Sequence, residues 1–433
     1  MTISPEQRRI IQVLAAGAVL LFFVFYNAVF LLDKYSDVGY GQTDLTVFYV
    51  VGAAMTSQHG LEPAEVLDKK ALRQAIMELR EHRGGTQFLY PPQSAVLFVP
   101  FSITSLDAMT RAWALVNAAL FLGALYVCIH YLLRDDVLKF RYTALVLALA
   151  FAPPVQGLFG TGQVNGALLF VMMGGLALIA HKNGWLAGAG FGLVAVVKVF
   201  PLFLLPYMVL KKQWKAAVAM VLVIAVLFAA AVPLFGTEKT MKTLTSVQKA
   251  VISGDLGDIK ASSSLYGSFR TSIKNGEFDW IAPNSDTPRK GLAKTFRDAL
   301  TWITMLVGAG AAGVLWRYRK RILPEDLLID YSMVMLFVLL FARSTHKQYH
   351  LYILPFSLYL LCFPLTKKNI PVHILSFCTL AMTQFWNYLP VSGEQTLAGF
   401  KIMTFGLVLL FIVAFIVRLP AVQKRLDAGS FER

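Results

Sequence analysis

The sequence predicts an all-α protein that crosses a membrane many times. Hydrophobic residues make up 57% of the 433 positions and charged residues only 15%, a composition typical of integral membrane proteins. Apolar runs close to the ~20 residues that a helix needs to cross a bilayer recur along the chain. Basic residues stand between these runs, so the loops carry most of the charge.

The net charge and the cysteines narrow the classes of function. The formal net charge is +15, but a basic excess in a membrane protein gathers in cytoplasmic loops beside anionic lipid. We therefore expect membrane lipids as partners and no nucleic acid. Cys128, Cys362 and Cys378 lie inside apolar runs, away from water-filled loops in which a disulfide framework or a zinc cluster forms.

Apolar segments, about twelve in number, account for most of the chain. They fall near residues 10–32, 107–133, 142–159, 163–181, 184–197, 199–210, 215–235, 297–316, 326–342, 350–365, 371–388 and 397–418. The first follows Arg8 and Arg9 and is longer than the apolar part of a cleaved signal peptide, so we expect it to remain as a span. Residues 93–106 are too short to cross and are expected to enter the membrane only in part.

The basic loops orient these segments. Most of the basic residues between the segments fall on the same side of the predicted membrane arrangement. They are Arg134, Lys139, Arg141, Lys211, Lys212, Lys215, Arg317, Arg319, Lys320, Arg321, Lys367, Lys368, Arg418, Lys424 and Arg425. The positive-inside rule places that side, with both termini, in the cytoplasm. The long polar loops 33–92 and 236–296 then share the periplasmic face of a bacterial inner membrane. We treat residues 1–433 as one integral membrane domain.

The first periplasmic loop, residues 33–92, contains the carboxylate best suited to catalysis. An apolar stripe at helical spacing predicts a short interfacial helix; its members are Leu45, Phe48, Tyr49, Gly52 and Met55. With Thr43 as N-cap, Asp44 lies in the first turn, where the helix dipole favours an ionised carboxylate. Asp44 is therefore either a dipole partner or a general base at the water boundary. A second helix is expected from Pro63 to His82.

Lys198 interrupts an apolar stretch at a predicted periplasmic turn. A charge there is costly unless it faces water, protein or an anionic partner. It is either a lysine that snorkels to the lipid interface or a contact to a substrate phosphate. Gln163 and Asn165 end a stretch, residues 151–165, that prolines and glycines interrupt. Their amides either bind a sugar or cap a helix.

Further donors suited to a phosphate gather at another predicted periplasmic end, where Arg343, His346 and His350 lie close in sequence. In the second periplasmic loop, small residues that include Ser264 lead to Arg270, and this patch is either a linker or a head-group contact. Asp255 and Asp258 in the same loop suit a solvated loop better than a metal site. We predict no metal and no cofactor.

An ordered series of short motifs resembles glycosyltransferase family 87. The motifs are DLTVFYVVGAA at 44–54, YPP at 90–92, GQVN at 162–165, KVFPLFLLP at 198–206 and YILP at 352–355. The segment SSSLYGSFR at 262–270 is similar to a family loop pattern, with Ser262 and Ser263 in place of amides and the arginine one residue early. The paired histidines of the family are spread to His346 and His350, either of which suits the role.

The resemblance implies a GT-C-like fold with short interfacial helices in the periplasmic loops. It implies an inverting transferase that moves a sugar from a polyprenyl-phosphate donor to a lipid or glycan acceptor, with Asp44 as general base. Mannose is the first expectation for the sugar and arabinofuranose the alternative. The implied phosphate contacts are Lys198, Arg270, Arg343, His346 and His350, and the implied sugar or acceptor contacts are Tyr90, Gln163, Asn165 and Ser264.

Two other functions are compatible with a basic polytopic protein. A lipid-linked sugar flippase or transporter would show internal repeats and ionisable residues near the bilayer midplane. We find no convincing repeat, and apart from Lys198 and Arg111 the predicted segments hold almost no such residues. A non-catalytic partner in cell-envelope assembly would make Asp44 dispensable.

Overall fold

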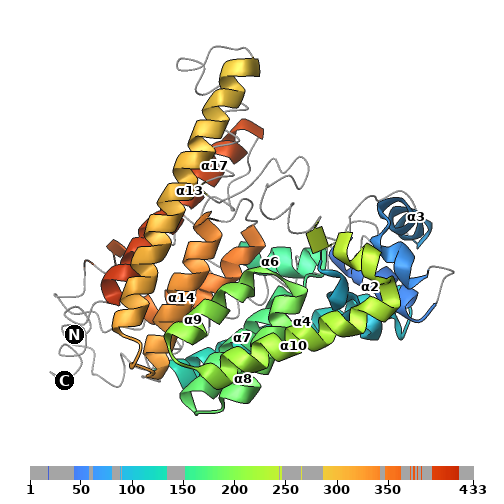
Figure 1. Cartoon of the computed structure of the whole chain (residues 1–433), viewed down its shortest axis with the longest axis horizontal. Coiled ribbons are helices and arrows are strands. Elements are labelled where there is room, and N and C mark those ends of the chain that lie inside the picture. Colours follow the sequence, from blue (N-terminus) through green and yellow to red (C-terminus); the bar gives the residue numbers. More distant parts are fainter. Residues whose placement is uncertain are drawn as a thin grey trace. The chain divides into compact units, whose positions relative to one another are not determined.

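The structure is a computed structural model that describes residues 18, 43–57, 62–79, 88, 90–133, 152–242, 244–245, 265, 286–341, 347–361, 371, 374–375, 378, 382 and 393–418. These residues form helices and turns with no strand among them, which confirms the all-α prediction for this part of the chain (Figure 1). The chain divides into two compact units. The site unit is Tyr26–Cys128 with Val155–Ile252, and the C-terminal unit is Met1–Phe25, Ile129–Pro154 and Ser253–Arg433.

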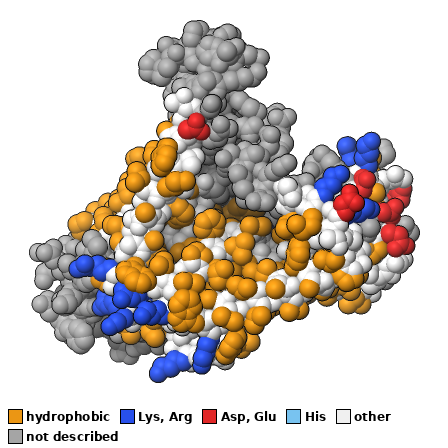
Figure 2. Space-filling model, viewed as in Figure 1, with side chains coloured by type: hydrophobic (Ala, Val, Ile, Leu, Met, Phe, Trp, Pro, Cys, Tyr) orange, Lys and Arg blue, Asp and Glu red, His pale blue; other side chains and the backbone are white. Residues whose placement is uncertain are grey.

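Among the described helices, three are long and apolar enough to cross a membrane. They are Leu106–Leu132, formed by α4 (Leu106–Val127) and the π-helical η4 (Cys128–Leu132), then α10 (Trp214–Phe235), and Asp298–Arg317 within α13 (Asp286–Arg317). Hydrophobic side chains cover much of the visible surface (Figure 2), and Val226 of α10 is 65% exposed. Such faces suit contact with lipid. The full set of about twelve spans stays a prediction.

Close helix packing in the site unit depends on glycine. Gly184, Gly188 and Gly192 are one turn apart on α8 (Gly184–Val197) and face α10, beside which α8 lies (Figure 1). A Cβ at Gly188 would collide with the backbone of Ala216, and one at Gly192 would lie 2.9 Å from the Met220 carbonyl oxygen. Small residues at this spacing let membrane helices approach closely. Because both contacts advance by four residues, α8 and α10 run parallel.

This parallel arrangement gives the site unit two chemically different ends. The turn 181–183 joins α7 (Asn165–Ala180) to α8, and the turn 211–213 joins α9 (Leu204–Leu210) to α10. Lys182, Lys211 and Lys212 therefore lie at one end, which we call the lysine end. The start of α7 and the last residue of α8 lie at the other, which we call the site end.

Between α8 and α9, the 3-10 helix η6 (Phe200–Phe203) begins with Pro201 in its first turn, as expected for a proline that ends the preceding helix.

The helix predicted around Asp44 is present as α2 (Thr43–Met55), with Asp44 in its first turn. Its burial differs from the expected single stripe, because Val47, Val50 and Val51 are also at most 3% exposed. The cause is η3 (Pro92–Ser102), which packs along α2. A Cβ at Gly52 would collide with the Phe98 carbonyl, so this glycine is what allows the close approach.

The single helix predicted from Pro63 to His82 is wrong. The structure has η2 (Pro63–Leu67) and α3 (Lys69–Leu79), with Asp68 between them in an extended conformation. Asp68 Oδ1 accepts hydrogen bonds from the backbone N–H groups of Lys70 and Ala71, at 2.7 and 3.2 Å. An aspartate in this position caps a new helix, which is why the first one ends here.

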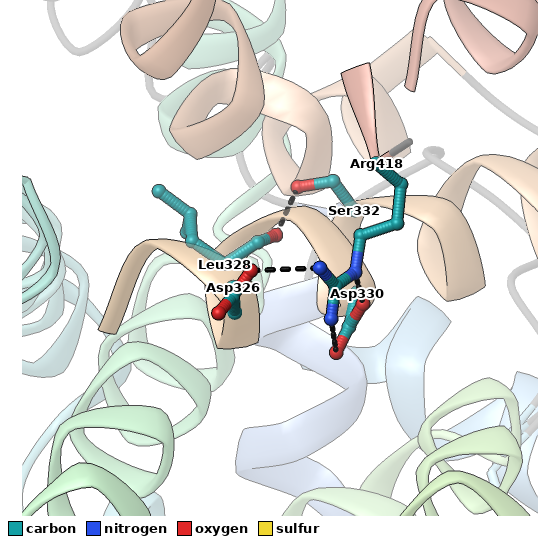
Figure 3. Close-up of polar contacts among 5 residues, drawn as sticks. All are labelled: Asp326, Leu328, Asp330, Ser332 and Arg418. Atoms are coloured by element: carbon teal, nitrogen blue, oxygen red, sulfur yellow. Dashed lines mark hydrogen bonds and ion pairs between the residues drawn. The ribbon is translucent and has the colours of Figure 1, made fainter. Parts of the chain in front are cut away.

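The C-terminal unit contains a buried ion cluster. Its described elements after α13 are α14 (Pro324–Phe341), η7 (Lys347–Ile353), α15 (Leu354–Leu361) and α17 (Gly393–Val417). Arg418, directly after α17, bonds through Nη1 to Asp326 Oδ1 at 2.7 Å and through Nε to Asp330 Oδ1 at 2.5 Å (Figure 3). The sequence counted Arg418 among the cations of the cytoplasmic side, and the structure shows that this side chain is fully buried.

Candidate active site

The candidate site is built around one glutamine at the site end. Gln163 Nε2 donates a hydrogen bond to Asp44 Oδ2 at 2.6 Å. Gln163 Oε1 accepts hydrogen bonds from Asn165 Nδ2 at 2.7 Å and from Lys198 Nζ at 3.3 Å. The amide thus presents its donor to the carboxylate and its acceptor to the lysine, and joins the two across the site.

The position of Gln163 follows from how α6 (Ala152–Thr161) ends. Gly162 adopts a φ of +68°, a left-handed conformation that glycine tolerates without strain. The N–H of Gly162 bonds to the Phe159 carbonyl and the N–H of Gln163 to the Leu158 carbonyl. These two bonds define a Schellman motif with Gly162 at C′, which fixes the direction of the chain before α7 begins.

Lys198 caps the C-terminus of α8 with an extended backbone, and its N–H bonds to the Val194 carbonyl. Its side chain is buried, with only 8% of the residue exposed. Its ammonium group lies 6.0 Å from the ring centroid of Tyr90. At this distance a desolvated cation gains from the negative face of the ring, so Tyr90 and Gln163 both help to hold the buried charge.

An aromatic cluster extends from this site into the unit. The Phe48 ring, one turn after Asp44 on α2, lies 5.2 Å from Tyr90 and stacks on Phe98 at 4.4 Å. Phe98 contacts Phe101 at 5.8 Å, and Phe101 contacts Trp113 at 4.7 Å. Offset and edge-to-face aromatic contacts are directional as well as hydrophobic. The cluster therefore fixes the position of α2, which carries Asp44, and of Tyr90, which lies just before η3.

Burial brings the pKa values of Asp44 and Lys198 closer together. Both groups lie outside the three candidate spans. Burial raises the pKa of Asp44 above its ordinary value of 3.8, while the charge of Lys198 and the hydrogen bond from Gln163 act to lower it. Burial lowers the pKa of Lys198 to about 7, against the opposing charge of Asp44. A carboxylate whose pKa rises toward working pH is a stronger base.

The structure brings together five of the predicted site residues. Asp44, Gln163, Asn165 and Lys198 form the hydrogen-bonded cluster, and Tyr90 lies beside it. His350 is fully buried in η7 and belongs to the C-terminal unit. Arg270, Arg343, His346 and Ser264 lie outside the described residues. The individual roles of all these residues stay predictions.

Two residues that the sequence did not single out also contact the site. Trp113 Nε1 donates to the Gly162 carbonyl at 3.0 Å, and Asn117 Nδ2 donates to the Gln163 carbonyl at 2.7 Å. They lie one turn apart on α4. The sequence did offer a signal for Asn117, because an amide inside a predicted apolar span needs a hydrogen-bond partner. The structure agrees with it, since Asn117 is only 1% exposed. Tryptophan gives no such signal, since it is common in membrane helices.

The fold and the cluster define a membrane protein with a partly buried carboxylate beside buried amides and a buried lysine, at one end of packed helices. Comparison with known proteins gives the family. The profile of glycosyltransferase family 87 matches residues 88–342, and the chain belongs to this family. The predicted family resemblance is thereby confirmed.

Two curated relatives are both named alpha-(1->3)-arabinofuranosyltransferase and come from Mycobacterium tuberculosis strains CDC 1551 and H37Rv. Each is 29% identical over 163 residues, which is 36% of this chain. The chain spans only 37% of the length of each relative. The similarity therefore covers only part of this chain and only part of each relative.

Proposed function

We propose that this protein is an inverting glycosyltransferase of the membrane. In this proposal it moves a sugar from a polyprenyl-phosphate donor to a hydroxyl group of a lipid or glycan acceptor, and Asp44 is the general base. The observation that carries the proposal is the 2.6 Å hydrogen bond from Gln163 to Asp44, beside Lys198, in a chain of glycosyltransferase family 87. A carboxylate base and a nearby cation are the two groups that this reaction needs.

The geometry supports a direct displacement. Gln163 occupies Asp44 Oδ2, and among the described residues no hydrogen bond reaches Oδ1, so we assign Oδ1 to accept the proton of the acceptor hydroxyl. The acceptor oxygen bonds to the anomeric carbon as the bond from that carbon to the phosphate oxygen breaks. The phosphate leaves with the electron pair, and the anomeric configuration inverts. A single carboxylate suffices because phosphate, unlike an alcohol, needs no acid to leave.

Lys198 is proposed to stabilise the leaving phosphate. A fixed positive charge in a water-poor site stabilises developing negative charge more strongly than the same charge in water. The buried ammonium of Lys198 has this character. Arg270, Arg343, His346 and His350 are proposed as further phosphate contacts. Tyr90, Asn165 and Ser264 are proposed to contact the sugar or the acceptor, with Gln163 sharing that role.

The two ends of the site unit support the predicted orientation. Lys182, Lys211 and Lys212 lie at the lysine end, whereas Asp44 and Lys198 lie at the site end. The positive-inside rule assigns the lysine end to the cytoplasm. We therefore propose that the reaction occurs at the periplasmic face of the inner membrane, with both chain termini in the cytoplasm.

Two sugars are candidates for the group that the donor carries. Mannose is the first expectation from the family, and arabinofuranose is favoured by the names of the mycobacterial relatives. Because that alignment covers 36% of this chain, it does not rank arabinofuranose above mannose. Both donors belong in the same experiment.

The test is sugar transfer by the purified protein in detergent. Short-chain polyprenyl-phosphate mannose and polyprenyl-phosphate arabinofuranose are offered separately with a membrane-lipid extract, and the anomeric configuration of any product is read by NMR. We expect one donor to give a product of inverted configuration. A product of retained configuration would contradict the single-displacement mechanism, and no product from either donor would contradict these two sugars as substrates.

A further inference from the structure

The turn that carries Gln163 is held from outside by one face of α4. The carbonyl groups of Gly162 and Gln163 follow each other in the chain, and each accepts a side-chain hydrogen bond, from Trp113 and Asn117 respectively. The two donors lie 49 and 46 residues from their acceptors in sequence. The contacts are therefore tertiary, and they reach both peptide groups that flank Gln163, on which the position of its side chain depends.

Asn117 is poorly explained as a packing residue. Its Oδ1 is buried without a hydrogen-bond partner among the described residues, and leaving such an atom unpaired opposes folding. An aliphatic side chain would fill the space without that penalty. The helix after the turn approaches so closely that a Cβ at Gly166 would lie 2.5 Å from this same Oδ1. The amide is thus confined, with its donor end aimed at the Gln163 carbonyl.

Trp113 links the same turn to the other side of the site. Its ring packs on Phe101 at 4.7 Å, and the aromatic cluster continues through Phe98 to Phe48 on α2. Its Nε1–H meanwhile bonds to the Gly162 carbonyl. One side chain therefore contacts both the cluster that supports Asp44 and the turn that supports Gln163.

We propose that Trp113 and Asn117 are positioning residues: they hold the two peptide groups on either side of Gln163, so that the Gln163 amide meets Asp44 and Lys198 together. This inference rests on the proposed function for its catalytic consequence, but the geometry that it describes is independent of the sugar. Neither residue touches a reacting atom in this account.

The first experiment compares kcat/KM for sugar transfer as a function of pH in the wild type and in Trp113→Phe, which keeps an aromatic ring but loses the N–H donor. We expect kcat/KM to fall by about 10- to 100-fold, because small displacements of catalytic groups are costly. The acidic limb should also move to higher pH, because the hydrogen bond from Gln163 lowers the pKa of Asp44. Lys198 is the charged group whose field acts on Asp44 among the described residues, and it is unchanged in this variant.

Asn117→Leu provides a second variant, and Trp185→Phe is the matched control because Trp185 is 51% exposed on α8. The control should keep the wild-type rate and pH profile. A double-mutant cycle with Gln163→Met then separates positioning from general destabilisation. If Trp113 acts through the Gln163 side chain, Trp113→Phe should lower the rate little further in the Gln163→Met background.

A pH profile and rate for Trp113→Phe and Asn117→Leu that match those of Trp185→Phe would overturn the inference. Full additivity in the cycle would overturn it too. If the wild type transfers neither sugar, the proposed function fails, and an infrared titration of the Asp44 carboxyl, isolated by difference against Asp44→Asn, takes over as the readout. A shift of that titration to higher pH in Trp113→Phe supports positioning, and an unchanged titration contradicts it.

Discussion

A single amide decides how the charged residues of the site are arranged. A glutamine has a donor and an acceptor end, and here the Nε2 end meets the Asp44 carboxylate while the Oε1 end meets Lys198 and Asn165. Reversal of the amide would place oxygen against oxygen at Asp44 and N–H against N–H at Lys198. The charges on both sides therefore fix its orientation, which in turn fixes which Asp44 oxygen is available.

The pH dependence of transfer should report both charged groups. The base must be deprotonated, so kcat/KM should fall as pH drops through the raised pKa of Asp44. It should also fall as pH rises through the pKa of Lys198, which burial lowers to about 7. In Lys198→Met we expect about a hundredfold lower rate, an acidic limb at higher pH because the positive charge that lowers the pKa of Asp44 is gone, and no basic limb from this residue.

Lys70→Met is the matched control for this pH measurement. Lys70 is an exposed lysine of α3, and its charge acts on Asp68. This variant should retain the wild-type rate and both limbs. A Lys198→Met profile that coincides with the wild-type profile would show that Lys198 acts neither on Asp44 nor on the leaving phosphate.

At the scale of elements, α14 and the residue after α17 are joined by ionic contacts as well as apolar packing. Asp326 and Asp330 are one turn apart on α14 and both bond to Arg418, whose guanidinium also lies 5.2 Å from the Tyr318 ring. Two buried carboxylates without their cation would be strongly destabilising. The end of α17 is thereby held at the start of α14.

We expect Arg418→Met to lower the free energy of unfolding in detergent by ~3–5 kcal/mol, since it leaves two buried carboxylates without a cation. Replacing the whole cluster, as Arg418→Met with Asp326→Leu and Asp330→Leu, should recover much of that loss. Arg317→Met, at an exposed arginine of α13, should change stability by less than ~0.5 kcal/mol. Equal stability of Arg418→Met and Arg317→Met would mean that the cluster does not hold α17.

At the scale of the whole molecule, we propose that the site end of the site unit lies outside the cytoplasm. The check is labelling of single cysteines by a membrane-impermeant maleimide in intact spheroplasts, with the three native cysteines replaced by serine. Thr104→Cys, exposed before α4 at the site end, should be labelled, whereas Lys212→Cys at the lysine end should be labelled only after lysis. The reverse pattern would invert the proposed orientation.

Much of the helical arrangement could be predicted because each helix is set by local signals. The predicted segment 184–197 coincides with α8, since Asn183 caps its start and Lys198 with Pro201 end it. The prediction of a single helix from Pro63 to His82 was wrong for an equally local reason. Asp68 caps a new helix, but in the sequence it looks like any solvated carboxylate.

The contacts that build the site could not be predicted in the same way. Asp44 and Gln163 were each candidates, but their hydrogen bond joins residues 119 positions apart, and spacing in sequence gives no distance across packed helices. Arg418 looked like one more basic residue of a tail because its partners lie 88 and 92 positions earlier. Trp113 falls within the predicted apolar segment 107–133, and a backbone carbonyl partner gives no signal in the sequence.

The central claim is that Asp44 is the general base, and the most direct measurement is the rate of sugar transfer by Asp44→Asn. The matched control is Asp68→Asn, because an asparagine can still cap α3 and the exposed carboxylate of Asp68 lies at the start of that helix. With both variants folded, we expect Asp44→Asn to lose at least about a hundredfold in rate and Asp68→Asn to match the wild type. A product formed at the wild-type rate by Asp44→Asn would contradict the account.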